Sequence, residues 1–469
     1  MLMTWLSIFP FIVVIIIAMK TKLVIPGLTA GLLTASFIYK PGLIIGLQQF
    51  YEFIMTGLKD ENNVKIVLFL YMFTGLIGLM KYTGGIKGFV QVASSKINSK
   101  KGALFLTWVS TLGTFSAPSF RIVTVAPIMK ALLNKVKITP QELGFVIETT
   151  ATPVIVLMPI ATAFVGYMSS VVQLSLKAEG IEGDGYRYFL QSIPYNFFSI
   201  SILLIGFYLS FFHHRKTPAT DAGNVEKKLD DQWEDCHPAV AKDLPTKPMN
   251  LLIPLGGVIL LTLLLTYWSG YKKGFTSLIK AFIEADVLDA MVFALLTTVL
   301  LTFIFYLFQR FSLKDLVTYF IEGGNEMMPV IVLLTVVWGL AASTEALGFS
   351  SFVTSNLDWI PTLFVPPVLF LVGAFISYFI GSSWGTWGIL MPLGISLGYS
   401  TGADLPVVIG AVFASGTFGA FASPLSDNTN TVARILQLNP MTYAKFKLGP
   451  ALLAAGLAAA GYFVISFVI

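Results

Sequence analysis

The chain has 469 residues, of which 55% are hydrophobic and only 12% are charged. A soluble domain carries about 25% charged residues, so this composition excludes a soluble globular enzyme. A membrane-spanning helix needs about 20 apolar residues, and 55% of the chain, about 258 residues, is enough for ten spans and two shorter intramembrane hairpins. The net charge of +5 does not indicate a nucleic-acid surface, because the Lys and Arg residues lie in short loops between apolar runs.

Apolar runs follow one another along the chain. The first begins at Trp5 with no basic residue ahead of it, which predicts a retained span and not a signal peptide. Segments 41–59 and 312–324 have an amphipathic pattern that predicts helices lying along the membrane surface. The runs lie at about residues 5–19, 23–39, 64–80, 102–133, 143–174, 190–212, 250–268, 287–308, 327–343, 361–397, 405–433 and 446–469.

Four of these runs are interrupted by Gly and Pro. Runs 102–133 and 361–397 contain several breakers each, which predicts re-entrant hairpins, because irregular backbone at membrane depth survives only where protein or a water-filled cavity satisfies it. Runs 143–174 and 405–433 are predicted to be broken spanning helices. The interruptions therefore indicate irregular backbone at membrane depth in both halves of the chain.

The breakers also reveal an internal repeat. Pro127 and Pro159 are 32 residues apart, as are Pro392 and Pro424, and the two pairs are offset by 265 residues. The order of runs and interruptions agrees with that offset throughout. The prediction is an all-α polytopic membrane protein of two repeats of five spans, each with a re-entrant hairpin and a broken helix. Its predicted parts are a first membrane repeat at 1–212, a cytoplasmic linker loop at 213–249 and a second membrane repeat at 250–469.

Five crossings per repeat make the second copy inverted relative to the first. With that arrangement one side of the membrane holds 21 of the 30 Lys and Arg residues and the other side holds 8, with Arg121 inside a hairpin. The excess of positive charge predicts that the linker is cytoplasmic and that both termini are outside. We expect a multi-pass protein of the cell membrane, in contact with lipid.

The sequence contains no phosphate-binding glycine motif, nucleophile elbow or paired-cysteine metal motif. This leaves secondary transport as the expected activity and predicts no enzyme. Asp427 follows the Pro424 break, and a hard cation such as sodium prefers oxygen ligands of the kind gathered there. The alternative is that Asp427 only caps a half-helix. The predicted ion- and proton-binding set is Asp427 as the sodium ligand, with Ser423, Ser426, Asn428, Thr429, Thr417, Ser382, Ser383 and Thr386.

Two more charged residues fall inside predicted membrane segments, where each is a functional candidate. Arg121 lies in the first hairpin and Glu148 in the first broken helix. They either form a mutual salt bridge, or Glu148 carries a proton while Arg121 competes with a cation or binds a substrate carboxylate. The predicted substrate or charge-pair set is Arg121, Glu148, Ser119, Thr149 and Thr152.

The residues of the second repeat resemble the NhaC family of sodium/proton antiporters. The similarity rests on Gly-Ser-Ser-Trp-Gly-Thr at 381–386 followed by Pro392, on residues 410–418, and on Ser-Pro-Leu-Ser-Asp at 423–427. The resemblance implies two inverted repeats, alternating access and sodium/proton antiport. It also implies a homodimer, no resident cofactor, and sodium and protons as the transported or coupling ions.

The first repeat departs from the family pattern. Residues 116–119 read Ser-Ala-Pro-Ser and residues 158–162 read Met-Pro-Ile-Ala-Thr, where NhaC-type sequences repeat the hairpin and break motifs, and Ala420 replaces a common acid. Some relatives exchange small organic anions with sodium and protons. The alternative prediction is therefore a sodium- or proton-coupled transporter of a small organic anion or amino acid.

Overall fold

The fold is entirely helical wherever the computed structural model describes the chain. The described residues form helices and connecting loops, with no strand among them. They are residues 6–94, 99–115, 117–130, 133–136, 138–160, 162–212, 247–275, 281, 285–349, 352–353 and 359–468.

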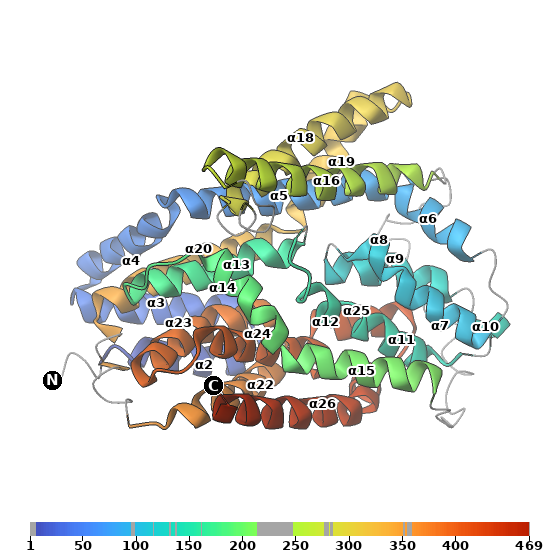
Figure 1. The fold of residues 1–469 in the computed structure, drawn as a ribbon. Coiled ribbons are helices and arrows are strands. Elements are labelled where there is room, and N and C mark those ends of the chain that lie inside the picture. The colour runs from blue at the N-terminus through green and yellow to red at the C-terminus, as the bar shows by residue number, and fades with distance from the viewer. Residues whose placement is uncertain are drawn as a thin grey trace.

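The first half of the chain forms a series of helices with several interruptions (Figure 1). Its helices are α2 (Phe9–Thr21), α3 (Val24–Tyr39), α4 (Leu43–Leu58), α5 (Glu61–Tyr82), α6 (Gly85–Ser94), α7 (Lys100–Val109), α8 (Thr111–Thr114), α9 (Pro118–Lys130), α10 (Leu133–Val136), α11 (Pro140–Thr149), α12 (Thr152–Ile155), α13 (Ala163–Ala178), α14 (Gly185–Ser192), η1 (Ile193–Tyr195) and α15 (Phe197–Phe211).

The second half has longer helices. These are α16 (Met249–Lys272), α18 (Val287–Phe308), α19 (Leu313–Asn325), α20 (Met328–Ala346), η4 (Thr362–Phe364), α22 (Val365–Ile380), α23 (Ser383–Thr401), α24 (Leu405–Ala422), α25 (Asp427–Ile435) and α26 (Pro440–Val468).

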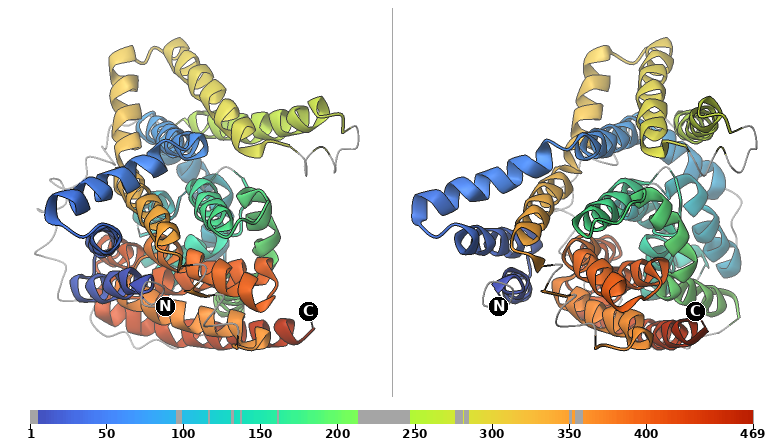
Figure 2. Two further views of the ribbon diagram at one scale, coloured as in Figure 1. Left: turned by 90° about the vertical axis from the view of Figure 1, so that its left-hand side faces the viewer. Right: turned by 60° about the vertical axis from the view of Figure 1, so that its left-hand side comes forward.

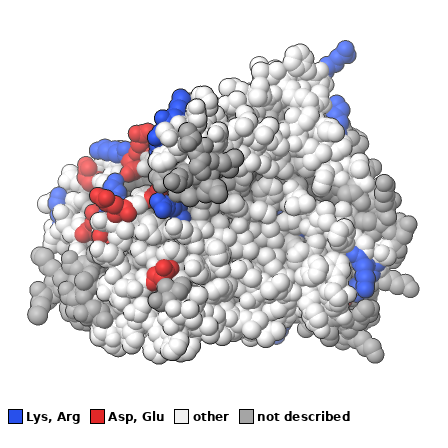
Figure 3. Space-filling view, in the orientation of Figure 1, with Lys and Arg blue, Asp and Glu red and all other residues white. Residues whose placement is uncertain are grey.

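Seven described helices are long and apolar enough to cross a membrane, and the pair Gly185–Tyr195 and Phe197–Phe211, bent by 43°, makes an eighth candidate. Helices α2 and α3 are apolar but shorter, so length alone does not give the ten expected crossings. Large apolar side chains are exposed along the outer faces of α16, α18 and α26. In Figure 3 the acidic side chains of one face lie toward its left together with several basic ones, a few more basic side chains lie along its right, and most of that face is uncharged. The chain is therefore a polytopic membrane protein.

Both interrupted regions of the second half are broken at the residues expected from the sequence. Helices α22 and α23 are joined by Gly381 and Ser382 and pack on each other, so run 361–397 forms a helical hairpin, and its re-entry from one side of the membrane stays a prediction. Helix α24 ends at Ala422 and α25 begins at Asp427, so run 405–433 is a broken helix. In the first half α7, α8 and α9 form the matching hairpin region, and α11, α12 and α13 the matching broken helix.

The starts of α11 and α24 agree with the repeat offset of 265. Thr139 accepts a hydrogen bond from the Glu142 amide, and Asp404 accepts one from the Val407 amide, so these N-caps stand in corresponding places. A capping oxygen satisfies one of the free amides at a helix start. This agreement is what a two-fold repeat predicts, and both the repeat and its inverted relation stay predictions.

Helices α4 and α19 correspond to the two segments predicted to be amphipathic. Helix α19 packs closely on α5, where a Cβ built on Gly78 would lie 2.4 Å from the Tyr319 carbonyl oxygen and one built on Gly323 would lie 2.5 Å from the Thr74 oxygen. The two backbones thus touch at a position that only glycine allows. In Figure 2, α4 extends sideways, and α18 and α19 project from the body.

The two halves interleave. Helix α5 packs on α19, α20 on α3 and α4, α13 on α23, and α9 on α25, and each of these contacts joins one half to the other. In Figure 1 α15 ends and α16 begins at the right, on either side of the linker, whereas both termini lie toward the left. The end of α15 and the start of α16 therefore lie toward the same end of the bundle, and the side of the membrane that this end faces stays a prediction.

Candidate functional site at the crossing of two broken helices

The two broken helices meet at their interruptions. The Asn428 side-chain amide, in the first turn of α25, donates a hydrogen bond of 2.8 Å to the Thr152 hydroxyl at the start of α12. Helix α11 also contacts α25, and α12 contacts α24. Thr152 and Asn428 come from different predicted sets, and the structure brings them together.

Hydroxyl groups stabilise the irregular backbone of residues 423–426. The Ser423 hydroxyl donates to the Tyr378 carbonyl oxygen at 2.6 Å and accepts from the Leu425 amide at 3.0 Å. The Ser426 hydroxyl donates to the Ala420 carbonyl oxygen at 2.6 Å. These two serines replace bonds that the helix interruption removes, since buried backbone groups must be paired. They have a structural role whether or not an ion binds.

The tip of the second hairpin lies against this interruption. Gly381 has φ of +75°, and a Cβ there would lie 2.6 Å from the Leu425 carbonyl carbon, so the turn and the close approach both require glycine. The Ser382 hydroxyl accepts from the Gly385 amide at 3.3 Å, and the Thr386 hydroxyl donates to the Ser382 carbonyl oxygen at 2.8 Å. Ser383 is buried beside them. The structure thus places the hairpin tip beside the Pro424 break.

Asp427 is the first residue of α25, where the helix dipole favours a negative charge. Its side chain is exposed, and no ion pair to it is found among the described residues. The predicted ligands around Asp427 have different hydrogen-bond partners. Thr417 lies inside α24 and donates to the Phe413 carbonyl oxygen at 2.9 Å, whereas Thr429 is buried and accepts from Lys447 at 2.8 Å. Asp427 is thus the carboxylate at this break that is not held by a cation in the described contacts.

Glu148 is paired with a residue that the sequence interpretation missed. Its Oε2 atom accepts hydrogen bonds of 2.5 Å from both the Lys447 ammonium and the Tyr443 hydroxyl. Glu148 is 2% exposed and Lys447 is 0% exposed. The prediction of a mutual Arg121–Glu148 salt bridge is therefore wrong. Glu148 pairs with Lys447 of α26 instead.

The Lys447 ammonium is fully bonded. It also donates to the Phe421 carbonyl oxygen at 2.7 Å and to the Thr429 hydroxyl at 2.8 Å, which together with Glu148 uses all three of its N–H groups. The ring centroids of Tyr443 and Phe421 lie 4.6 Å and 5.2 Å from the nitrogen. The count of Lys and Arg residues on the two sides of the membrane treated Lys447 as a loop residue. Its spacing of four residues from Tyr443 was a signal that the two side chains share one face of a helix.

Arg121 holds the first hairpin together. Its two terminal nitrogens donate to the Thr107 carbonyl oxygen at 2.6 Å, to the hydroxyls of Thr114 at 2.8 Å and Ser110 at 3.2 Å, and to the Thr150 hydroxyl at 2.6 Å. These partners come from α7, α8, the α7–α8 junction and the end of α11, and all are neutral. Its Nε atom is buried without a hydrogen-bond partner.

The other members of that predicted set are dispersed. The Thr149 hydroxyl is buried and has no hydrogen-bond partner, and it faces α15, where a Cβ on Gly206 would lie 2.5 Å from its methyl group. Ser119 is exposed on α9. Thr152 is bonded directly across to the second broken helix, through Asn428.

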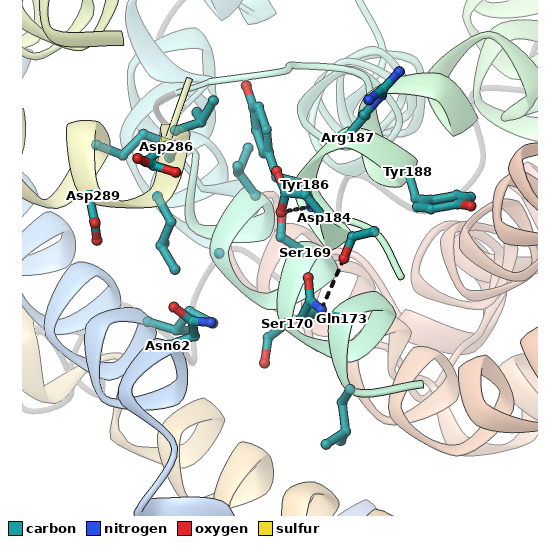
Figure 4. Close-up of a pocket in the computed structure, with 18 of the residues that line it drawn as sticks. Asn62, Ser169, Ser170, Gln173, Asp184, Tyr186, Arg187, Tyr188, Asp286 and Asp289 are labelled. Atoms are coloured by element: carbon teal, nitrogen blue, oxygen red, sulfur yellow. Dashed lines mark hydrogen bonds between the residues drawn. The ribbon is translucent and has the colours of Figure 1, made fainter. Parts of the chain in front are cut away.

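A separate cavity of about 520 Å³ lies where α5, α13, α14 and α18 meet. Figure 4 shows Asp286 and Asp289 on one side of it, with Asp184 and Tyr186 across the space. Its lining holds more acidic than basic side chains, and none of the predicted site residues is among the described lining. Burial raises the pKa of the Asp184 carboxyl, and the amides of Tyr186 and Arg187 oppose that shift, although part of the side chain reaches the opening.

Comparison with known proteins agrees with this architecture. A protein of Haemophilus influenzae with no characterised function is 24% identical over 479 residues, covering 98% of this chain and 91% of its own. The malate-2H(+)/Na(+)-lactate antiporter of Bacillus subtilis is 29% identical over 143 residues, 29% of this chain and 30% of its own. The Na(+)/H(+) antiporter NhaC of Alkalihalophilus pseudofirmus is 28% identical over 170 residues, 34% of this chain and 36% of its own.

Two solved structures share the fold. The efflux pump MtrF of Neisseria gonorrhoeae superposes with a TM-score of 0.68 at 13% identity, covering 100% of this chain and 97% of its own. The YdaH transporter of Alcanivorax borkumensis gives 0.60 at 13% identity, covering 89% of this chain and 88% of its own. The model of the Na+/H+ antiporter family matches residues 154–466, which include both halves of the second hairpin and the α24–α25 break. The chain therefore belongs to the Na+/H+ antiporter family, and it is a secondary transporter and not an enzyme.

Proposed function

We propose that this transporter exchanges sodium ions for protons by alternating access, with Asp427 as the main cation and proton site. The observation that carries the proposal is the position of Asp427 at a helix interruption, exposed and without a cationic partner among the described residues. A carboxylate in this setting attracts a cation or a proton, and the two compete for the same oxygen atoms. Family membership and the NhaC relative support the same reading.

The proposed sodium position at Asp427 includes fewer ligands than the sequence suggested. Asn428 and Thr429 follow Asp427 in the chain, but their side chains form hydrogen bonds with Thr152 and Lys447. The Ser423 and Ser426 hydroxyls donate to backbone carbonyl oxygens. A sodium ion at Asp427 would therefore depend on the carboxylate, on water and on rearrangement of these bonds during transport. The protein would operate as a homodimer in the cell membrane, with the linker cytoplasmic and both termini outside.

The test is a proton-flux assay in proteoliposomes. Sodium, lithium or potassium is added outside, and a trapped dye reports internal pH. We expect sodium to move protons in the wild type and Asp427→Asn to abolish the movement. The control is Asp404→Asn, which changes the capping aspartate at the other end of α24 and keeps the acceptor for the Val407 amide. Sodium-driven flux that survives Asp427→Asn in a correctly folded protein would exclude Asp427 as the site.

A coupled carrier of a small organic anion is the second candidate. The buried Arg121 has only neutral oxygen partners among the described residues, and one relative is named a malate-2H(+)/Na(+)-lactate antiporter. The candidate stands second because the terminal nitrogens of Arg121 are already occupied, and Nε is the remaining donor. Stabilisation by lactate or malate that disappears in Arg121→Ala would favour it over sodium/proton exchange.

A further inference from the structure

The buried Lys447 ammonium has the surroundings of a bound cation. It is held by one carboxylate oxygen, one backbone carbonyl oxygen and one hydroxyl oxygen, at 2.5, 2.7 and 2.8 Å. Oxygen ligands of these three kinds are the ones that hard metal cations prefer. They come from α11, α24 and α25, so the ammonium lies where both broken helices contribute a ligand.

The carboxylate has unused capacity. Glu148 Oε1 is buried and has no hydrogen-bond partner, while Oε2 accepts from both Lys447 and Tyr443. A buried carboxylate oxygen without a partner costs free energy, since it has lost its water. The position therefore offers one more oxygen ligand than the ammonium uses.

We propose that Lys447 is a tethered counter-cation. Its ammonium group occupies a second monovalent-cation position formed by Glu148, Thr429 and the Phe421 carbonyl, and a transported sodium ion takes that position when the ammonium withdraws. The inference rests on the proposed cation exchange and adds a second binding position to it. The lysine stabilises the carboxylate while no transported ion is present.

Charge and reach both permit this exchange. Replacing an ammonium by a sodium ion leaves the net charge beside Glu148 unchanged, so the carboxylate is never left as an isolated buried charge. Lys447 stands seven residues after Pro440, about 10 Å along α26 from the start of the helix. A lysine stem is long and flexible enough to carry its ammonium toward that end of the helix.

The experiment uses the purified full-length protein and thermal melting, with sodium chloride titrated against choline chloride at constant ionic strength. We expect Lys447→Met to be stabilised at a sodium concentration at least tenfold lower than the wild type needs, because its tethered competitor is gone. Adding Glu148→Gln to Lys447→Met should abolish that gain. A Lys447→Met protein without the gain, or a gain that persists in the double variant, would overturn the proposal and leave a purely structural ion pair.

A measurement on the wild type does not depend on the folding of a variant. If sodium displaces the ammonium, saturating sodium should raise the labelling of Lys447 by an amine-reactive reagent, read by mass spectrometry, while that of Lys100 on the bundle surface stays constant. Unchanged labelling of Lys447 would overturn the proposal. If sodium drives proton flux while the labelling of Lys447 stays unchanged, the proposed role of Lys447 is rejected and sodium/proton antiport is retained. If sodium stabilises Lys447→Met at lower concentration but drives no proton flux, the second cation position is retained and antiport is rejected.

Discussion

The Asn428 side-chain amide donates a 2.8 Å hydrogen bond to the Thr152 hydroxyl, and this single contact joins the interruptions of two helices that are 276 residues apart in the chain. Each partner stands at the start of a half-helix, α25 or α12, so the bond ties the two interruptions together. Through this bond the broken helix of the first half of the chain contacts the broken helix of the second half.

Removing either partner should weaken that contact. We expect Asn428→Ala and Thr152→Val each to lower the free energy of unfolding by about 0.5–1.5 kcal/mol, the usual net value of a hydrogen bond, and the double variant to lose less than the sum. Thermal or denaturant unfolding measures the cycle. Asn430→Ala is the control, because Asn430 bonds the Pro424 and Ser426 carbonyl oxygens of its own segment. It should be additive with Thr152→Val.

The Glu148–Lys447 pair predicts a strong interaction energy. In sodium-free buffer Glu148→Gln or Lys447→Met alone should cost about 3–5 kcal/mol, because each leaves a buried charge without its partner, and the double variant should recover much of that loss. Arg121→Ala combined with Glu148→Gln should be additive within about 0.5 kcal/mol, since the two share no partner. A large non-additive term between Arg121 and Glu148 would contradict the observed pairing.

The α5–α19 crossing predicts a sharp dependence on side-chain size. Gly78→Ala places a methyl group 2.4 Å from the Tyr319 carbonyl oxygen, so we expect it to cost about 1–3 kcal/mol. Gly256→Ala on α16 meets nothing within 4 Å and should be neutral or slightly stabilising. Melting temperatures of the two variants in one detergent test this. Equal effects at both glycines would show that the backbone contact is unimportant for stability.

The cavity predicts a pH-dependent effect at Asp184. Its raised pKa means that the folded protein binds this proton more tightly than the unfolded chain does. Stability from this group therefore falls as pH rises from the ordinary value of about 3.9 through the raised folded pKa. Asp184→Asn keeps an acceptor for the Tyr186 amide and should melt above the wild type at neutral pH. The difference should vanish at low pH, and a constant difference would refute the interpretation.

The helix interruptions were predictable because they arise from local chemistry. Gly381 and Pro424 are strong breakers within apolar runs, and the structure turns or breaks the helix at both. Thr417 illustrates the limit of that reasoning. It obeys the repeat offset with Thr152, yet it lies in regular helix and bonds its own backbone.

The pairing of Glu148 was not predictable in the same way. Its cation comes from α26, and a contact between residues 299 positions apart leaves no local signal in one sequence. Lys447 lies at the edge of the apolar run expected at 446–469, and the helix begins six residues before that run, at Pro440, so the lysine stands inside regular helix. The cavity beside Asp184 escaped notice for a related reason, since segments from α5, α13, α14 and α18 form it together.

The long separation of Glu148 and Lys447 also constrains how the protein is made. A ribosome adding about 5–20 residues per second needs roughly 15–60 s to travel from one residue to the other. During that interval the newly inserted first half contains a carboxyl group whose lysine has not yet been synthesised. The neutral, protonated acid is the form that a membrane tolerates, so the ion pair would be established only when α26 is inserted. Formation of this ion pair therefore depends on insertion of the last helix.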